Sequence, residues 1–477
     1  MFRIRCLALA AALLLAIPAS LAASRGLPRS VADALRAASV PLHAVAIVVQ
    51  EAGAQRPSLS VNAQAAMNPA SAMKLFTTFA ALELLGPAYH WKTEAYLDGP
   101  LQEGVLDGNL VLKGYGDPRL DYESFWLLLR ALRGKGLREI RGDLVLDRSF
   151  FAPGNGDPGG FDGEALRPYN VLPDALLVHY KSIRFAFVPE PERDAVRVYV
   201  APRPPGLEVT SNLRLAAGDC VEGRAFRNLL APTFAPGPPP RVSFDGRYPV
   251  ACGEKDLNVA LLPPNAHVGG VLRELWAEAG GAWTGGAREG IVPETARLVH
   301  THESPALALI VRDINKHSNN VMARQLFLTL ATSANEPPAT PHQSRQVLRH
   351  WLNLKGIDAP ELSIENGSGL SRTDRASAAT LAALLQSAWT SAVMPEFIAS
   401  LPLAALDGTM KKRLLDEPVA GQAHVKTGLL SDARAMAGYL LDARGRRQIV
   451  VMLMNHPNAP DAEGANDALL RWVYERK

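Results

Sequence analysis

Residues 68–76 form a segment with both helical and chemical signals, Asn68-Pro69-Ala70-Ser71-Ala72-Met73-Lys74-Leu75-Phe76. Asparagine favours the cap of a helix and proline suits its first turn, so Asn68 and Pro69 predict a helix start. Apolar residues then recur at helical spacing, at Leu75, Phe76, Phe79, Leu82 and Leu85. We therefore predict a helix that ends near Gly86, with Ser71 and Lys74 in its first turn.

Ser71 and Lys74 are three residues apart, so their side chains share one face of this helix. A serine hydroxyl becomes a nucleophile when a base lies within hydrogen-bond reach, and a neutral lysine is such a base. The helix N-terminus also favours a negative charge on a reacting oxygen. The alternative is an amphipathic helix in which Ser-x-x-Lys occurs by chance.

A second polar cluster, Ser318-Asn319-Asn320, interrupts apolar residues that recur in helical steps from Leu307 to Leu330. Serine and asparagine are common in caps and in turns between helices, which is the structural explanation of this cluster. The same side chains could also orient a lysine or move a proton.

The third cluster, Lys426-Thr427-Gly428, lies on a predicted strand edge. Such an edge can bind an extended peptide as an additional strand. Gly428 would allow close approach, and Lys426 and Thr427 could hold a terminal carboxylate. The alternative is a surface turn with a solvated lysine.

The composition is that of an ordinary globular protein, with 48% hydrophobic and 20% charged residues in 477. This length predicts two or three domains. Short β-type segments separated by Gly, Asp and Pro turns occupy residues 91–294, with no strong helical pattern between residues 133 and 269. Helices return from residue 304, followed by two predicted strands at 435–441 and 448–454 and a terminal helix. We expect one or two β-rich modules inserted between helical regions.

The N-terminus has the pattern of a secretory signal peptide. Arg3 and Arg5 precede an apolar run from Leu7 to Ile17, which is followed by Pro18 and the small-residue site Ser20-Leu21-Ala22. We expect cleavage after residue 22, and no transmembrane segment after that cleavage. The alternative is an uncleaved membrane anchor.

Removing residues 1–22 takes away two arginines and no acidic residue, so the formal charge falls from +3 to +1. This balance gives no reason to expect nucleic acid or an acidic surface as a partner. Cleavage after residue 22 also removes Cys6 and leaves two cysteines, Cys220 and Cys252, which are 32 positions apart. In an oxidising compartment these two would form a disulfide; the alternative is two buried free thiols.

The three clusters occur in an order and context typical of penicillin-binding proteins and β-lactamases. Ser71 and Ser318 are 247 positions apart, far more than a compact β-lactamase needs, whereas Ser318 and Lys426 are 108 apart. The chain resembles the D-alanyl-D-alanine carboxypeptidase/endopeptidase family of class C low-molecular-mass penicillin-binding proteins. Further segments fit this resemblance: residues 116–118, 312–316, 366–372, 401–403 and 407–409. One departure is Ala405, where glycine is expected.

The resemblance implies an α/β (α+β) penicillin-binding/β-lactamase-like transpeptidase fold, an antiparallel sheet with helices, carrying large β-rich domains between the first and second motifs. The boundaries it suggests are a catalytic domain at 23–88 and 295–477, an insert domain at 89–166 and 263–294, and a third domain at 167–262 nested in the insert.

The resemblance also assigns roles in a serine D,D-peptidase acting on peptidoglycan stem peptides. Ser71 would form an acyl-enzyme, Lys74 would be its general base, Ser318 a proton relay, and Asn320 would orient Lys74. A lysine that is neutral at pH 7 needs a pKa about 3 below its usual value of about 10.4, which burial and a neighbouring positive charge can cause.

For binding, the resemblance implies that Lys426, Thr427 and Gly428 hold the substrate, and that the backbone N–H groups of Ser71 and Leu429 form the oxyanion hole. An arginine near the third motif and an insert-domain carboxylate bind the far end of the stem peptide in this family; Arg372 and Asp162 are the candidates.

Two other functions are considered: a β-lactamase, and a non-catalytic cell-wall-binding protein. The long insert counts against the first and the intact motifs against the second. The resemblance implies periplasmic localisation and acylation by β-lactam antibiotics. It is also compatible with a loose association of the protein with the membrane or the cell wall. No cofactor or metal is expected, because His300 and His302 have no third ligand at a suitable spacing.

Overall fold

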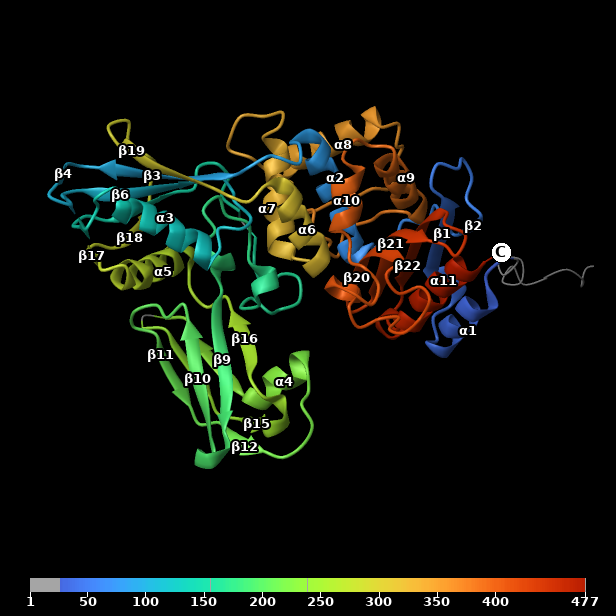
Figure 1. Cartoon of the computed structure of the whole chain (residues 1–477), viewed down its shortest axis with the longest axis horizontal. Coiled ribbons are helices and arrows are strands. Elements are labelled where there is room, and N and C mark those ends of the chain that lie inside the picture. The colour runs from blue at the N-terminus through green and yellow to red at the C-terminus, as the bar shows by residue number, and fades with distance from the viewer. Residues whose placement is uncertain (1–25, 155, 238, 477) are drawn as a thin grey trace, which may run out of the picture.

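The computed structural model describes residues 26–154, 156–237 and 239–476. The predicted signal peptide, residues 1–22, lies outside them. Three groups of elements have separate hydrophobic cores (Figure 1). We call them the main unit (residues 26–88 and 304–476), the first insert (residues 92–147 and 264–303) and the second insert (residues 183–259).

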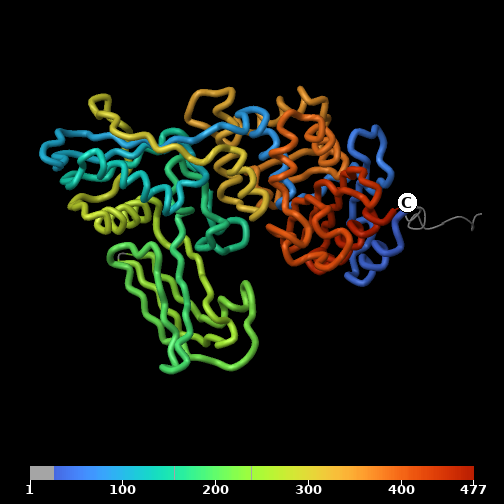
Figure 2. The backbone as a smooth tube through the Cα atoms, viewed as in Figure 1, coloured from blue at the N-terminus to red at the C-terminus, as the bar shows by residue number. Residues whose placement is uncertain are grey.

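The main unit is built on an antiparallel five-stranded sheet that joins both ends of the chain. Its order is β2 (Leu59–Val61), β1 (Val45–Glu51), β22 (Arg447–Asn455), β21 (Ala433–Leu441) and β20 (Ala423–Leu429). Ile47 of β1 pairs with Met452 of β22, so N-terminal and C-terminal segments lie side by side (Figure 2). This sheet explains why the first and third motifs lie close together.

Both faces of this sheet are covered by helices, because successive side chains of a strand point to opposite faces. Ala46 and Val48 of β1 enter one core, while Val45, Ile47 and Val49 enter the other. The helices in the first core are α2 (Lys74–Leu84), α6 (Leu307–His317), α7 (Asn320–Ala331), α8 (Pro341–Leu354), α9 (Ala378–Trp389) and α10 (Met394–Ser400). The second core contains α1 (Arg29–Ala37) and α11 (Glu463–Glu475). The predicted antiparallel sheet with helices is therefore confirmed.

The first insert is a mixed sheet with two helices against it. The sheet order is β18 (Ala287–Glu289), β8 (Leu144–Asp147), β6 (Asn109–Gly114), β3 (Lys92–Asp98) and β19 (Arg297–Glu303). A smaller sheet contains β17 (Ala282–Trp283), β7 (Glu139–Ile140), β5 (Val105–Leu106) and β4 (Leu101–Gln102). Side chains of α3 (Tyr122–Gly134) and α5 (Pro264–Glu278) complete its core.

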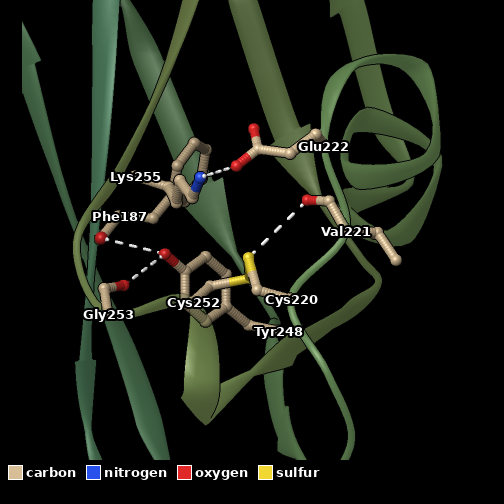
Figure 3. The surroundings of a disulfide bond; sticks show 8 residues. All are labelled: Phe187, Cys220, Val221, Glu222, Tyr248, Cys252, Gly253 and Lys255. Atoms are coloured by element: carbon tan, nitrogen blue, oxygen red, sulfur yellow. Dashed lines mark hydrogen bonds and ion pairs between the residues drawn. A yellow bond between two sulfur atoms is a disulfide. The ribbon is translucent and has the colours of Figure 1, made fainter. Parts of the chain in front are cut away.

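The second insert contains small sheets around an aromatic core. They are β10 (Ala195–Ala201), β9 (Ile183–Glu190) and β16 (Lys255–Val259); β11 (Glu208–Ser211), β14 (Arg241–Phe244) and β13 (Pro232–Ala235); and β12 (Arg214–Ala216) with β15 (Arg247–Pro249). The predicted Cys220–Cys252 disulfide is present beside Tyr248, whose hydroxyl donates to the carbonyl of Gly253 at 2.7 Å (Figure 3).

One helix of the second insert, α4 (Gly223–Leu230), lies in the stretch where the sequence shows no strong helical pattern. It is eight residues long, and its two buried residues, Phe226 and Leu230, are four positions apart, so its helical spacing extends over only about one turn. Among the helices that the structure describes, none combines the length and the hydropathy needed to cross a membrane.

Candidate active site

Ser71 lies in a 3-10 turn, Ala70–Met73, that leads directly into α2. The sequence predicts an α-helical first turn here, but the α-helix begins only at Lys74. Ala70 has a φ of +45°, outside the right-handed helical region, so a regular helix cannot extend back through Ala70. Asn68 nevertheless caps this turn, because its Oδ1 accepts a hydrogen bond from the N–H of Ala70 at 2.9 Å.

Lys74 is completely buried, and its amine faces three oxygen atoms. Its Nζ lies 2.9 Å from Ser71 Oγ, 2.6 Å from Asn320 Oδ1 and 2.5 Å from the carbonyl oxygen of Ser368. Burial lowers the pKa of Lys74 well below its ordinary value, and the positive charges of Lys426 and Arg324 lower it further, against a smaller opposing effect of Asp374. The structure thus favours the neutral amine.

This geometry fits a neutral lysine that acts as a base. An amide oxygen and a backbone carbonyl only accept hydrogen bonds, so Asn320 and Ser368 take the two hydrogens of a neutral amine. The remaining lone pair then faces Ser71 Oγ, in position to accept the hydroxyl proton. Ser71 and Lys74 therefore meet the geometric requirement for nucleophile and base.

The second motif is the turn between α6 and α7, as the sequence predicts. Ser318 follows α6 with a φ of +55°, and Asn319 caps α7 by accepting from the N–H of Met322 at 3.1 Å. This turn directs the Asn320 side chain to Lys74. The hydroxyl oxygen of Ser318 accepts from Lys426 Nζ at 2.9 Å and keeps its own proton available for donation.

The third motif lies on β20, the edge strand of the main sheet. Residues 402–404 bond to the outer edge of β20 as far as Val425. A Cβ atom on Gly428 would lie 2.8 Å from Ser71 N, so only glycine lets the strand pass this close. Leu429 follows directly; its N–H as an oxyanion donor stays a prediction.

Lys426 is the second fully buried lysine of the site. Its Nζ donates to Ser318 Oγ and, at 2.8 Å, to the carbonyl oxygen of Thr427. Burial lowers its pKa to about 7. The site therefore holds two amines that give up protons far more easily than lysines in water, each touching a serine hydroxyl.

Two contacts of this site were missed by the sequence reasoning. The Ser368 carbonyl is positioned by a loop in which Gly367 and Gly369 have positive φ; a Cβ on Gly369 would lie 1.9 Å from the Ala70 carbonyl oxygen. The hydroxyl of Thr409 lies 2.7 Å from that of Thr427. Both residues belong to segments that fit the family resemblance, and that was the only signal available.

Arg372 and Asp162 are not in contact with each other. Arg372 donates to Ser431 and Asp432, both at 3.2 Å, and its guanidinium lies 4.4 Å from the ring centre of Phe161, the neighbour of Asp162.

The Asp162 carboxylate accepts hydrogen bonds from neighbouring groups of residues 164–170. The donors are Tyr169 at 2.7 Å, Asn170 at 2.8 Å and the N–H of Glu164 at 3.0 Å. Burial raises the pKa of Asp162, but these hydrogen bonds outweigh burial and leave the pKa below its ordinary value. The binding role of Arg372 and Asp162 stays a prediction.

His300 and His302 lie on β19 of the first insert, in a different unit from the catalytic motifs. Within the described ranges, no group of three or more His, Cys, Asp and Glu side chains is placed to hold a metal ion.

Comparison with known proteins gives a consistent family. The chain is 26% identical over 425 residues to the D-alanyl-D-alanine carboxypeptidase DacB of Haemophilus influenzae, covering 87% of this chain and 86% of the relative. It is 26% identical over 416 residues to a D-alanyl-D-alanine carboxypeptidase of Actinomadura sp. strain R39, covering 84% and 76%. The crystal structure of penicillin binding protein 4 from H. influenzae superposes with a TM-score of 0.76 at 23% identity, covering 94% of this chain and all of that one, which shows the same fold.

The family model of the D-Ala-D-Ala carboxypeptidase 3 (S13) family matches residues 27–475, nearly the whole described chain. This match confirms the resemblance drawn from the three motifs and the long insert. The chain belongs to the D-Ala-D-Ala carboxypeptidase 3 (S13) family of serine-type D-Ala-D-Ala carboxypeptidases.

Proposed function

We propose that this protein is a serine D,D-peptidase of peptidoglycan stem peptides, which removes a terminal D-Ala or cleaves a cross-link made through D-Ala. The observation that carries the proposal is a contact between a buried lysine and a serine hydroxyl, with Lys74 Nζ 2.9 Å from Ser71 Oγ. Burial lowers the pKa of this lysine well below its ordinary value. Family membership sets the substrate class.

Acylation begins with attack of Ser71 Oγ on the carbonyl carbon of the penultimate D-Ala. Lys74 takes the hydroxyl proton as the new C–O bond forms. The charge that develops on the carbonyl oxygen is stabilised by the N–H groups of Ser71 and Leu429; the loss of one such donor typically costs about 3–4 kcal/mol.

The leaving group departs as a neutral amine, so it must gain a proton as the C–N bond breaks. Ser318 supplies this proton from its hydroxyl and is reprotonated through Lys426 or the proton held by Lys74. Water then attacks the ester, and Lys74 takes a proton from this water. The ester bond breaks, which releases the shortened peptide and restores the hydroxyl of Ser71.

The substrate binds as an extended strand along β20, where the edge beyond Val425 faces the site. In its charged state Lys426 attracts the carboxylate of the leaving D-amino acid, and Thr427 donates a hydrogen bond to it. The proposal assigns the far end of the stem peptide to Arg372 and Asp162; the contact of the Arg372 guanidinium with the ring of Phe161, the neighbour of Asp162, supports this assignment.

The proposal includes export to the periplasm through the predicted signal peptide at residues 1–22. It also includes acylation of Ser71 by β-lactams, because their strained amide presents the same carbonyl to the same nucleophile. A relative with this fold was crystallised in complex with a novel β-lactam.

The test is labelling with a fluorescent penicillin, followed by mass analysis of purified muropeptides. Wild-type protein should retain a stable label and release D-Ala or separate cross-linked dimers, and Ser71→Ala should do neither. Rapid turnover of the label without any change in muropeptides would instead indicate a β-lactamase. Muropeptide binding without labelling or cleavage would indicate a wall-binding protein.

A further inference from the structure

The first insert carries a cluster of arginines that the catalytic site does not use. Arg130 and Arg133 lie one turn apart near the end of α3, and Arg138 follows in the loop before β7. Together with Trp126 and Glu278 they line a cleft of about 590 Å³. The elements α3 and α5 that carry it lie at the opposite end of the molecule from the main sheet (Figure 1).

Two of these guanidinium groups are fixed in place by backbone carbonyls. Arg133 donates to the carbonyl oxygens of Leu137 and Arg138 at 3.1 and 3.2 Å, while Arg138 donates to the carbonyl oxygen of Arg133 at 2.5 Å. Both side chains thus bond to the backbone of the same segment, residues 133–138. Only one nitrogen of each guanidinium makes these bonds, so the other N–H donors remain free.

Aromatic rings support the same cluster. The guanidinium of Arg130 lies 5.1 Å from the ring centre of Trp126, and that of Arg133 lies 5.4 Å from that of Trp276. An arginine stacked on a ring keeps its edge N–H groups directed outward. The rings of Trp126 and Trp276 therefore help to hold the guanidinium groups of Arg130 and Arg133 in place.

The positive charges of the cluster are not neutralised. Among the residues that the structure describes, none of Arg130, Arg133 and Arg138 forms an ion pair with a carboxylate, whereas neighbouring Arg141 pairs with Glu139. Glu278 is the one carboxylate in the lining, against three guanidiniums. Burial lowers the pKa of Arg133, and the nearby charge of Arg138 lowers it further, the effect of like charges held together.

We propose that this cleft binds a phosphate group. Phosphate accepts several charge-assisted hydrogen bonds in the planar geometry that guanidinium offers, and it would relieve the repulsion between the arginines. The group could be a lipid headgroup phosphate or a phosphate ester on a soluble glycan; the chemistry of recognition is the same. The site is independent of the D,D-peptidase function.

Inorganic pyrophosphate is the probe, titrated into the full-length mature protein by calorimetry at low ionic strength. We expect saturable binding at one site per chain. Arg130→Glu should weaken it by at least about tenfold, because a charge-assisted donor is replaced by a repelling carboxylate. The Arg130 side chain makes no hydrogen bond to a described residue, so this variant should fold; a thermal unfolding curve checks it.

Arg56→Glu is the matched control, since it makes the same charge change at an exposed arginine of the main unit. Absence of saturable binding in the wild type, or an equal loss in both variants, would refute the site. Penicillin labelling should be unchanged in both variants, which separates this test from that of the catalytic proposal.

Sedimentation with phosphatidylglycerol vesicles distinguishes the two sources. Co-sedimentation of wild type but not of Arg130→Glu supports a lipid headgroup. Pyrophosphate binding without co-sedimentation supports a soluble phosphate ester.

Discussion

The centre of the main unit and the second insert bury opposite kinds of groups. The main unit places Lys74 and Lys426, both fully buried, between a sheet and helices with extensive apolar cores on both faces. The second insert has one smaller core of aromatic and aliphatic side chains, closed by a disulfide. A large core can offset the desolvation cost of two amines, whereas a small one needs a covalent constraint. The candidate active site and the disulfide thus lie in different units.

The largest effect is expected when the proposed nucleophile or its base is removed from the main unit. Ser71→Ala and Lys74→Gln should each lower the rate of penicillin acylation by at least about 10⁴-fold, as loss of a nucleophile or its base does in serine hydrolases. Stopped-flow fluorescence measures the rate. Unchanged circular dichroism is the control, and a Lys74→Gln variant that acylates at a near-normal rate would exclude Lys74 as the base.

The next test removes the covalent constraint of the second insert. Replacing both Cys220 and Cys252 by serine should lower the free energy of unfolding of that unit by about 3–4 kcal/mol, because the disulfide closes a 32-residue span. Denaturant unfolding of oxidised wild type and of the variant measures this. Labelling of Ser71 at 20 °C should stay normal; a parallel loss of labelling would show that the units are not separable.

Gly428→Ala tests the close approach of β20 to the nucleophile. The added Cβ would lie 2.8 Å from Ser71 N and 2.9 Å from Ala70 Cβ, so strand and turn must separate. Because a small misplacement can cost about 100-fold in rate, acylation should slow by that order. Gly464→Ala in α11 is the control, since its Cβ would meet nothing within 4 Å. Equal rates in the two variants would contradict the packing argument.

The two buried amines predict a bell-shaped pH dependence of kcat/KM for a peptide ending in D-Ala-D-Ala. On the acid side, Lys74 gains a proton and ceases to be a base, so the rate falls about tenfold per pH unit. On the alkaline side, Lys426 loses its charge as the pH rises through about 7, and attraction for the carboxylate weakens. Steady-state rates between pH 5 and 10 check this, and a continuous rise up to pH 10 would show that Lys426 is not needed as a cation.

The smallest effect is expected at Thr409. Its hydroxyl lies 2.7 Å from that of Thr427, and when Thr409 is the donor of this hydrogen bond the Thr427 proton stays available for the carboxylate of the proposed substrate. Thr409→Val should raise KM by about three- to tenfold, the usual contribution of a neutral hydrogen bond, with little change in kcat. Thr409→Ser should restore KM, and failure of that rescue would point to a packing role instead.

The sequence predicted the elements with long, regular patterns. β21 and β22 cover the strands predicted at 435–441 and 448–454, and α6 and α7 cover the helical steps from Leu307 to Leu330. It did not predict α4, whose helical spacing consists of a single pair of buried residues, Phe226 and Leu230, in a segment of eight. It also placed Ser71 in an α-helical turn, where the structure has a 3-10 turn that leads into α2.

The candidate site also contains residues that the sequence identified and contacts that it did not. Ser71, Lys74, Ser318, Asn320 and Lys426 were identified from their motifs, because each motif combines residue types that are rarely found together at that spacing. The Ser368 carbonyl was missed since a backbone oxygen has no residue type, and Thr409 was missed since its partner is 18 positions away in the chain.

By itself, the sequence determined which side chains can react and the family to which the chain belongs, because these depend on residue types, order and spacing. The tertiary structure decided the protonation of those side chains. Lys74 and Lys426 lose their usual affinity for protons through burial, and burial results from the packing of helices and strands that are hundreds of residues apart in the chain. No local pattern contains that information.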